Sequence, residues 1–310
     1  MDLLNGTHPI AREMKKYIAT PWCQCSPTNE WKACAECKPP MKSASVVQSH
    51  GGDLFQHSQW SALYLTLWYE RAKLYPKLHQ LLTQVVKSKL FTTVISDDLQ
   101  EKIGFLQLCG FLHDIGKGGD SEYDMYAAKK YAGKGDQAHP EYSKNYILNP
   151  GKKYNNLLAP LLEELFMRYK NPTQARMIVV LCAAVHWDFG KLNIPDGSPG
   201  HLTPTQYIKG VREMAKSLTI YKRDANDFIT LIKLSMVVSC ADIASAYNVE
   251  LLKNSGSQNR IGDIAIAKAT HLSKGSAWTE KEFNIKHPKY IRQVLALLSK
   301  QKKKTLKNKK

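Results

Sequence analysis

The sequence lacks the long apolar segments of membrane-spanning and secreted proteins. Its longest uninterrupted apolar run, residues 177–185, is far shorter than the roughly 20 residues that a membrane-spanning helix needs. No apolar stretch follows the charged N-terminus in the way that a signal peptide requires. We therefore expect a soluble intracellular protein that is cytoplasmic and has no membrane partner.

Acidic residues are scarce relative to basic ones. Asp and Glu number 27 against 44 Lys and Arg, which gives a formal net charge of +17 at pH 7. Part of the excess lies in a C-terminal lysine run, which could be an arm for nucleic acid, a nuclear or nucleoid address, or a solvated end. The run consists of Lys300, Lys302, Lys303, Lys304, Lys307, Lys309 and Lys310. The chain stays basic without it, which favours phosphorylated small molecules, nucleotides or nucleic acid as partners.

Alternating strand patterns and internal repeats are also missing. The long apolar segments have helical spacing instead, as in residues 54–75, where Trp60, Tyr64 and Trp68 share one face and are expected in the core. Similar patterns cover residues 101–117, 157–169, 172–190 and 228–247. We therefore predict an all-α fold.

Composition divides the chain into three parts. Residues 1–45 combine cysteines and prolines and predict an irregular N-terminal appendage. Residues 46–255 carry the long helical patterns and predict one helical domain. Residues 256–310 predict a helical extension that ends in the lysine run.

The seven cysteines fall into two sets. Four of them lie in the first 45 residues with C-x-C and C-x-x-C spacing, and either bind one structural zinc or form a tail of free thiols. These four are Cys23, Cys25, Cys34 and Cys37. The other three, Cys109, Cys182 and Cys240, lie on apolar helical patterns and predict buried thiols in a reducing compartment.

Ligand-type side chains interrupt or border the apolar helical patterns. His113 and Asp114 lie at the C-terminal end of one such helix, and Asp242 lies inside another. An ionised Asp is costly to bury unless it is neutralised, and a bound cation can neutralise several such groups at once. Three further histidines are candidates in similar settings: His57, His139 and His186. Among them, His139 is the least secure ligand, because it lies in a polar segment and could be an ordinary surface residue.

These side chains predict a divalent transition-metal site with one or two ions. Imidazole and carboxylate ligands suit Mn, Fe, Co, Ni or Zn, and an oxygen-rich site would admit Mg. Consecutive helical residues differ in direction by about 100°, so His113 and Asp114 can approach a metal from different sides. Because a carboxylate has two oxygens, Asp114 could bridge two ions.

In this order, the residues resemble the HD superfamily of metal-dependent phosphohydrolases, whose pattern is H…HD…H…H…D. The resemblance spans roughly residues 53–250 and includes the sequence motifs LFQHS, HDIGK and AHPEYS. It implies an all-α HD-type domain with His57, His113, Asp114 and Asp242 as the core metal set. It also implies that His139 and His186 hold a second ion.

Two further residues would assist catalysis. Lys117, in the HDIGK motif, looks like the lysine that dinuclear family members place beside the metals, where it could steady a phosphate oxygen. Trp187 follows His186 and could line the substrate pocket. The chain departs from the motifs of the alarmone hydrolases, the deoxynucleotide triphosphohydrolases and the cyclic-dinucleotide phosphodiesterases, which weakens those readings.

The resemblance therefore implies a metal-dependent phosphoric ester hydrolase that acts on a nucleotide or another phosphorylated substrate, with Asp114 and Lys117 as catalytic residues. Other functions stay open: a nuclease on RNA or single-stranded DNA, a di-iron oxygenase of the HD type, and a non-catalytic binding protein. The sequence does not determine the oligomeric state.

Overall fold

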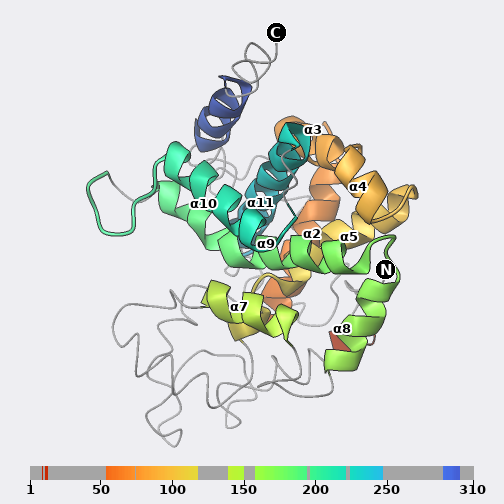
Figure 1. The fold of residues 1–310 in the computed structure, drawn as a ribbon. Coiled ribbons are helices and arrows are strands. Elements are labelled where there is room, and N and C mark those ends of the chain that lie inside the picture. The colour runs from red at the N-terminus through yellow and green to blue at the C-terminus, as the bar shows by residue number, and fades with distance from the viewer. Residues whose placement is uncertain are drawn as a thin grey trace, which may run out of the picture.

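The computed structural model describes residues 9, 11–12, 54–73, 75–117, 139–149, 158–193, 196–220, 224–246 and 289–300. Within these residues 83% are helical and none is in a strand, which confirms the expected all-α class (Figure 1). The four N-terminal cysteines that could bind a structural zinc lie outside the described residues: Cys23, Cys25, Cys34 and Cys37.

The first half of the described chain has four helices, three of which begin at a local start signal. These are α2 (Leu54–Glu70), α3 (Pro76–Val86), α4 (Lys89–Val94) and α5 (Leu99–Leu112). Pro76 occupies the first turn of α3, where its missing N–H costs no hydrogen bond. The Ser88 hydroxyl accepts a hydrogen bond from the Phe91 N–H and caps α4. The Asp98 carboxylate does the same for the Glu101 N–H at the start of α5.

The second half, up to residue 246, has five α-helices and two short 3-10 helices. In chain order they are η3 (Ile115–Lys117), α7 (His139–Leu148), α8 (Leu158–Met167), α9 (Pro172–Gly190), η4 (Lys191–Asn193), α10 (Pro204–Ser217) and α11 (Ala225–Ala246). Thr203 and Gln206 form a reciprocal capping box at the start of α10. Residues 289–300 form a further helix, as their apolar spacing predicts.

The core lies where α2, α5, α9 and α11 meet. Helix α2 packs against α5 and α11, and α9 packs against α7 and α11 (Figure 1). Every residue from Lys102 to Leu112 is buried, so α5 is covered on all sides. The expected aromatic face of α2 is confirmed in the core by Trp60, Tyr64 and Trp68. Because α5 is buried along most of its length, the two residues that directly follow it, His113 and Asp114, are also buried.

Helix α11 is long and apolar enough to cross a membrane by length and composition. Its segment Ala225–Ser245 has a mean hydropathy of 1.7, but 83% of that window is buried inside the protein. A count of uninterrupted apolar residues misses this segment because serines and threonines divide it. Such extensive burial is typical of a helix at the centre of a folded core.

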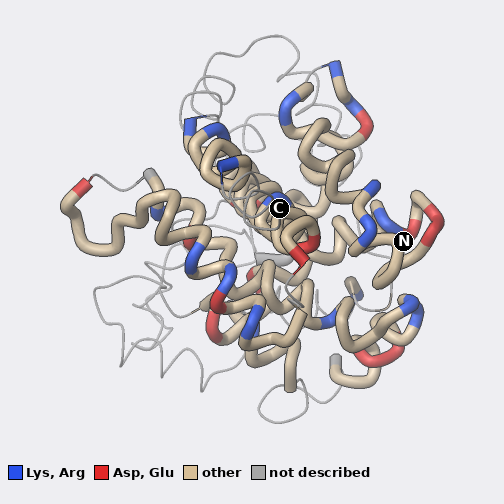
Figure 2. The backbone as a smooth tube through the Cα atoms, turned by 45° about the horizontal axis from the view of Figure 1, so that its top comes forward, with Lys and Arg blue, Asp and Glu red and all other residues tan. Residues whose placement is uncertain are grey.

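Charged residues lie mainly on the outer turns and ends of the helices (Figure 2). Among the described residues, the buried charged side chains other than histidines are Lys102, Asp114 and Asp242. Lys102 donates a hydrogen bond to the Thr92 hydroxyl at 3.1 Å. The two carboxylates lie together among buried histidines, and this group is the candidate site.

Candidate metal centre

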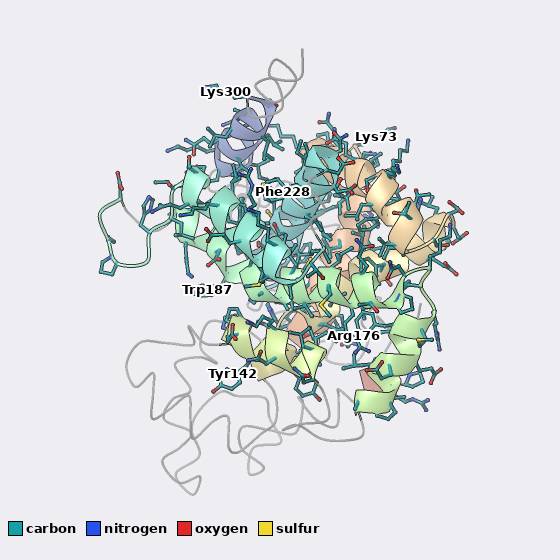
Figure 3. All side chains as sticks on the ribbon, viewed as in Figure 1. Lys73, Tyr142, Arg176, Trp187, Phe228 and Lys300 are labelled. Atoms are coloured by element: carbon teal, nitrogen blue, oxygen red, sulfur yellow. The ribbon has the colours of Figure 1, made fainter. Side chains whose placement is uncertain are left out.

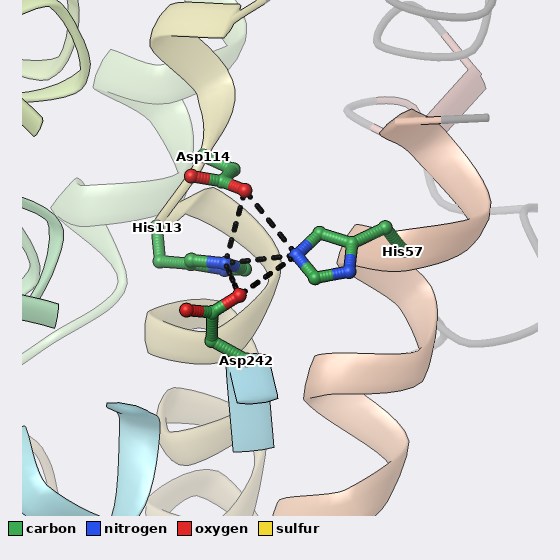
Figure 4. Close-up of side chains that lie close together, drawn as sticks. All are labelled: His57, His113, Asp114 and Asp242. Carbon is green, nitrogen blue, oxygen red and sulfur yellow. Dashed lines mark hydrogen bonds and ion pairs between the residues drawn. The ribbon is translucent and has the colours of Figure 1, made fainter. Parts of the chain in front are cut away.

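Four buried side chains from three parts of the chain form one group of ligand atoms, called here the first group. His57 comes from α2, His113 caps the C-terminal end of α5, Asp114 follows it, and Asp242 comes from α11 (Figure 4). Each offers an atom within 4.8 Å of the others. The His57 Nε2 atom lies 3.2 Å from Asp114 Oδ2 and 3.1 Å from Asp242 Oδ1.

A second group of ligand atoms lies on the other side of Asp114. It consists of Asp114, His139 at the start of α7 and His186 in α9. The two imidazole Nε2 atoms are 2.8 Å apart. His139 is only 1% exposed, so the alternative that it is a surface residue is wrong.

Asp114 belongs to both groups and presents a different oxygen to each. Its Oδ2 atom lies 3.2 Å from His57 Nε2 and 3.3 Å from His113 Nε2. Its Oδ1 atom lies 3.3 Å from His139 Nε2 and 3.2 Å from His186 Nε2. The structure therefore brings together all six ligand-type residues expected from the sequence, with Asp114 at the centre.

Hydrogen bonds to the backbone orient two of the imidazoles. The His113 Nδ1 atom lies 2.6 Å from the carbonyl oxygen of Gly110, and His186 Nδ1 lies 2.7 Å from that of Ala183. A carbonyl oxygen can only accept, so Nδ1 carries the proton in both rings. In the neutral ring, Nε2 then has a lone pair that is directed at the centre of the group.

The spacing of these atoms fits metal coordination. For metal–ligand distances of about 2.1 Å, neighbouring donors of one ion lie about 3.0 Å apart in an octahedron and about 3.4 Å apart in a tetrahedron. In the first group, His113 Nε2 lies 3.2 Å from His57 Nε2 and 3.4 Å from Asp242 Oδ1. Lone pairs and carboxylate oxygens at such distances repel one another unless protons or a cation lie between them. Each group could therefore hold a divalent cation.

The same crowding perturbs the acid–base properties of the side chains. Burial lowers the pKa of His113, but the carboxylates of Asp114 and Asp242 outweigh burial and raise it to about 10. Burial raises the pKa of Asp242, but hydrogen bonds with His113 and His57 outweigh it and hold the pKa well below its usual value. Burial lowers the pKa of His186, and the nearby His139 acts in the same direction. These shifts show strong charge coupling within the cluster.

A glycine of the HDIGK motif lets the two groups approach each other. A Cβ atom on Gly116 would lie 2.2 Å from the backbone nitrogen of Ser143 in α7, so only glycine fits there. The Gly116 N–H also donates to the buried Ser143 hydroxyl at 2.9 Å. This contact holds η3 against the helix that carries His139.

The two proposed substrate residues are described to different extents. Only the backbone of Lys117 is described, as the last residue of η3, so its expected catalytic contact lies outside the described side chains. Trp187 is 37% exposed, and its ring meets that of His139 edge to face with centroids 5.5 Å apart. Trp187 of α9 thus lies beside α7, which also carries Tyr142 (Figure 3).

Sequence reasoning missed several buried serines at the site. Ser245 contacts His57, Ser61 contacts Ser245, and Ser143 contacts Gly116. Two of them have a recognisable spacing, because Ser61 follows His57 by four positions and Ser245 follows Asp242 by three. Residues at such spacings lie on the same face of a helix, so this signal could have marked them.

The fold and the site define an all-α protein with a buried His/Asp cluster that could bind metal, which is consistent with an HD-like site. Comparison with protein-family models, curated proteins and solved structures finds no significant match for this chain.

Proposed function

We propose that this chain is a divalent-metal-dependent phosphohydrolase or phosphodiesterase of the HD superfamily, with one ion in each group. One observation carries the proposal: the two oxygens of the buried Asp114 face two separate sets of imidazole Nε2 atoms. A carboxylate that faces two ligand sets could contribute to holding two ions, and paired ions would stabilise both the attacking and the leaving oxygen in phosphoester hydrolysis.

The donor set favours particular ions. The first group has two imidazoles and two carboxylates, and the second has two imidazoles and one carboxylate. Nitrogen ligands suit Mn, Fe, Co, Ni or Zn better than Mg. When bound, such ions lower the pKa of a coordinated water and polarise a phosphoryl oxygen. The protein residues keep the donor atoms oriented, and Asp114 ties the two groups to one rigid position.

The substrate is proposed to be a nucleotide or another phosphorylated small molecule. The net charge of +17 attracts anions, and Lys117 follows the ligands at a position from which we propose it contacts a phosphate oxygen. Trp187, partly exposed beside His139, is proposed to line the substrate side of the centre. The described cysteines are free and buried, which supports the proposed cytoplasmic location.

The first experiment compares the wild type with the double variant His113→Ala/Asp114→Ala. Metal content is measured by elemental analysis, and hydrolysis is measured with bis(4-nitrophenyl) phosphate as a generic phosphodiester. The matched control is His201→Ala/Asp196→Ala, which removes another His–Asp pair, 3.6 Å apart, outside the cluster. We expect metal and activity in the wild type and control, and neither in the cluster variant.

Three results would change the assignment. Equal metal content in wild type and cluster variant would refute the metal centre. Iron that depends on the cluster, together with oxygen consumption and no hydrolysis, would indicate the di-iron oxygenase. Cluster-dependent metal with neither reaction across a panel of nucleotides would indicate a binding protein.

A further inference from the structure

We infer that Ser245 is a positioning residue of the metal centre, which holds His57 in the tautomer whose Nε2 atom can bind an ion. The inference rests on the metal centre proposed above. It concerns a side chain that is not itself a ligand and that comes from α11, on the opposite side of His57 from the proposed ion.

The contacts of Ser245 form a short chain of buried hydrogen bonds. Its Oγ atom lies 2.9 Å from His57 Nδ1, 2.9 Å from Ser61 Oγ and 2.7 Å from the carbonyl oxygen of Asp242. All three side chains, His57, Ser61 and Ser245, are fully buried. One hydroxyl thus connects a ligand from α2 with the backbone of a ligand from α11.

The directions of these hydrogen bonds follow from the chemistry of the partners. The Asp242 carbonyl can only accept, so the single hydroxyl proton of Ser245 is donated to it. The Ser245 oxygen then accepts from its other two neighbours, His57 Nδ1–H and the hydroxyl of Ser61. With the proton on Nδ1, the Nε2 atom of a neutral His57 has its lone pair directed toward Asp114 and Asp242.

This arrangement sets His57 apart from two other ligands. His113 and His186 donate their Nδ1 protons to carbonyl oxygens three residues earlier in their own helices. Such backbone acceptors remain when any single side chain is changed. For His57 the acceptor is the hydroxyl of Ser245, 188 positions away in the sequence, and a single substitution removes it.

The proposed role has a selective consequence. Ser245 contacts only the first group, because His57 and Asp242 do not belong to the second group. Loss of its hydroxyl should therefore lower the affinity of the first group for its ion. The affinity of the second group, Asp114, His139 and His186, should not change. Removing an oriented hydrogen-bond partner of a metal-binding histidine commonly costs about 10–100-fold in metal affinity.

The test uses Zn²⁺ as a diamagnetic probe with the full-length protein. Zn²⁺ affinity is measured by competition with a chromophoric chelator for wild type, Ser245→Ala and Ser239→Ala. Ser239 is the matched control, since it is a fully buried serine of the same helix whose hydroxyl donates to a backbone carbonyl at 2.8 Å. Thermal melting in chelator confirms that each variant is folded.

A second readout follows the proton itself. The Nδ1–H resonance of His57 is recorded by NMR in the Zn²⁺-loaded proteins and assigned from its loss in His57→Gln. We expect Ser245→Ala to shift this resonance and to weaken one of two Zn²⁺ ions by about 10–100-fold. Ser239→Ala should change neither quantity. Ser61→Ala keeps the acceptor for His57 and should lose less affinity than Ser245→Ala.

The outcomes separate this inference from the metal centre itself. If Ser245→Ala binds both ions like the wild type, or leaves the His57 resonance in place, the positioning role is wrong while the metal centre stands. An equal loss in Ser239→Ala would also overturn it, because the effect would then be a general one on α11. If His113→Ala/Asp114→Ala binds Zn²⁺ like the wild type, the metal centre fails first.

Discussion

The shared carboxylate of Asp114 leads to a prediction about metal stoichiometry. Asp114→Asn keeps the size of the side chain but replaces one oxygen with an NH₂ group, which has no lone pair for a metal. In the wild type, Asp114 Oδ2 faces the first group and Asp114 Oδ1 faces the second group. The variant can therefore present oxygen to only one group, and we expect it to bind one ion instead of two.

The size of the effect can be worked out as a thermal shift. A ligand at 100 times its dissociation constant stabilises the folded state by about 2.7 kcal/mol, so two independent ions give about 5 kcal/mol. For a domain of this size, 1 kcal/mol corresponds to about 2–4 °C in Tm. Saturating metal should raise the Tm of the wild type by about 10–20 °C and that of Asp114→Asn by about half as much.

The control for this prediction is Asp242→Asn. Asp242 contacts only the first group, through Oδ1, so a rotated amide can still present its one oxygen there. This variant should bind two ions, one of them more weakly. Differential scanning calorimetry with and without Zn²⁺, combined with elemental analysis, measures both quantities. Two tightly bound ions in Asp114→Asn would refute the bridging geometry.

The remaining predictions concern packing, protons, charge and substrate contact. Gly116→Ala places a Cβ atom 2.2 Å from the backbone nitrogen of Ser143. We expect the free energy of unfolding, measured in urea, to fall by about 1–3 kcal/mol. The ion held by the second group should also bind more weakly. The pKa of His113 is raised to about 10 in the metal-free protein, so a metal ion must displace its proton at pH 7. Metal affinity should therefore rise with pH. Calorimetry in buffers of different ionisation enthalpy should detect the released proton. If the substrate is a small nucleotide, kcat/KM should fall only modestly between 50 and 200 mM salt, whereas a steep fall by about 10³–10⁵-fold in binding would indicate a nucleic-acid substrate with several phosphate contacts. Trp187→Ala should raise KM for the substrate while leaving metal content unchanged, and unchanged kinetics would exclude the proposed contact.

Much of the fold could be read from local patterns. The segments that form α2, α5, α9 and α11 are apolar enough for helical spacing to stand out, and these are the helices of the core. Helical spacing did not identify α3 and α10, because these helices are shorter or more polar. Their start signals were nevertheless present, with Pro76 opening α3 and the pair Thr203 and Gln206 capping α10.

The candidate ligands could also be named from the sequence. A buried Asp in an apolar helix, such as Asp242, requires compensation wherever the helix packs, so its chemistry is visible without a structure. His139 was the exception, since its polar surroundings in the sequence do not show that α7 buries it against α9. Burial of that kind is a property of the packed helices and not of the segment.

Helical spacing determined the all-α class, because it depends on interactions within a few positions. The order H…HD…H…H…D named the candidate ligands. Only the tertiary structure decided which Asp114 oxygen faces which histidines, and that Ser245 supports His57 across 188 positions of chain. Those contacts depend on how α2, α5, α7, α9 and α11 cross one another. Crossing geometry is set by side-chain packing summed over the whole core, which no local stretch of sequence contains.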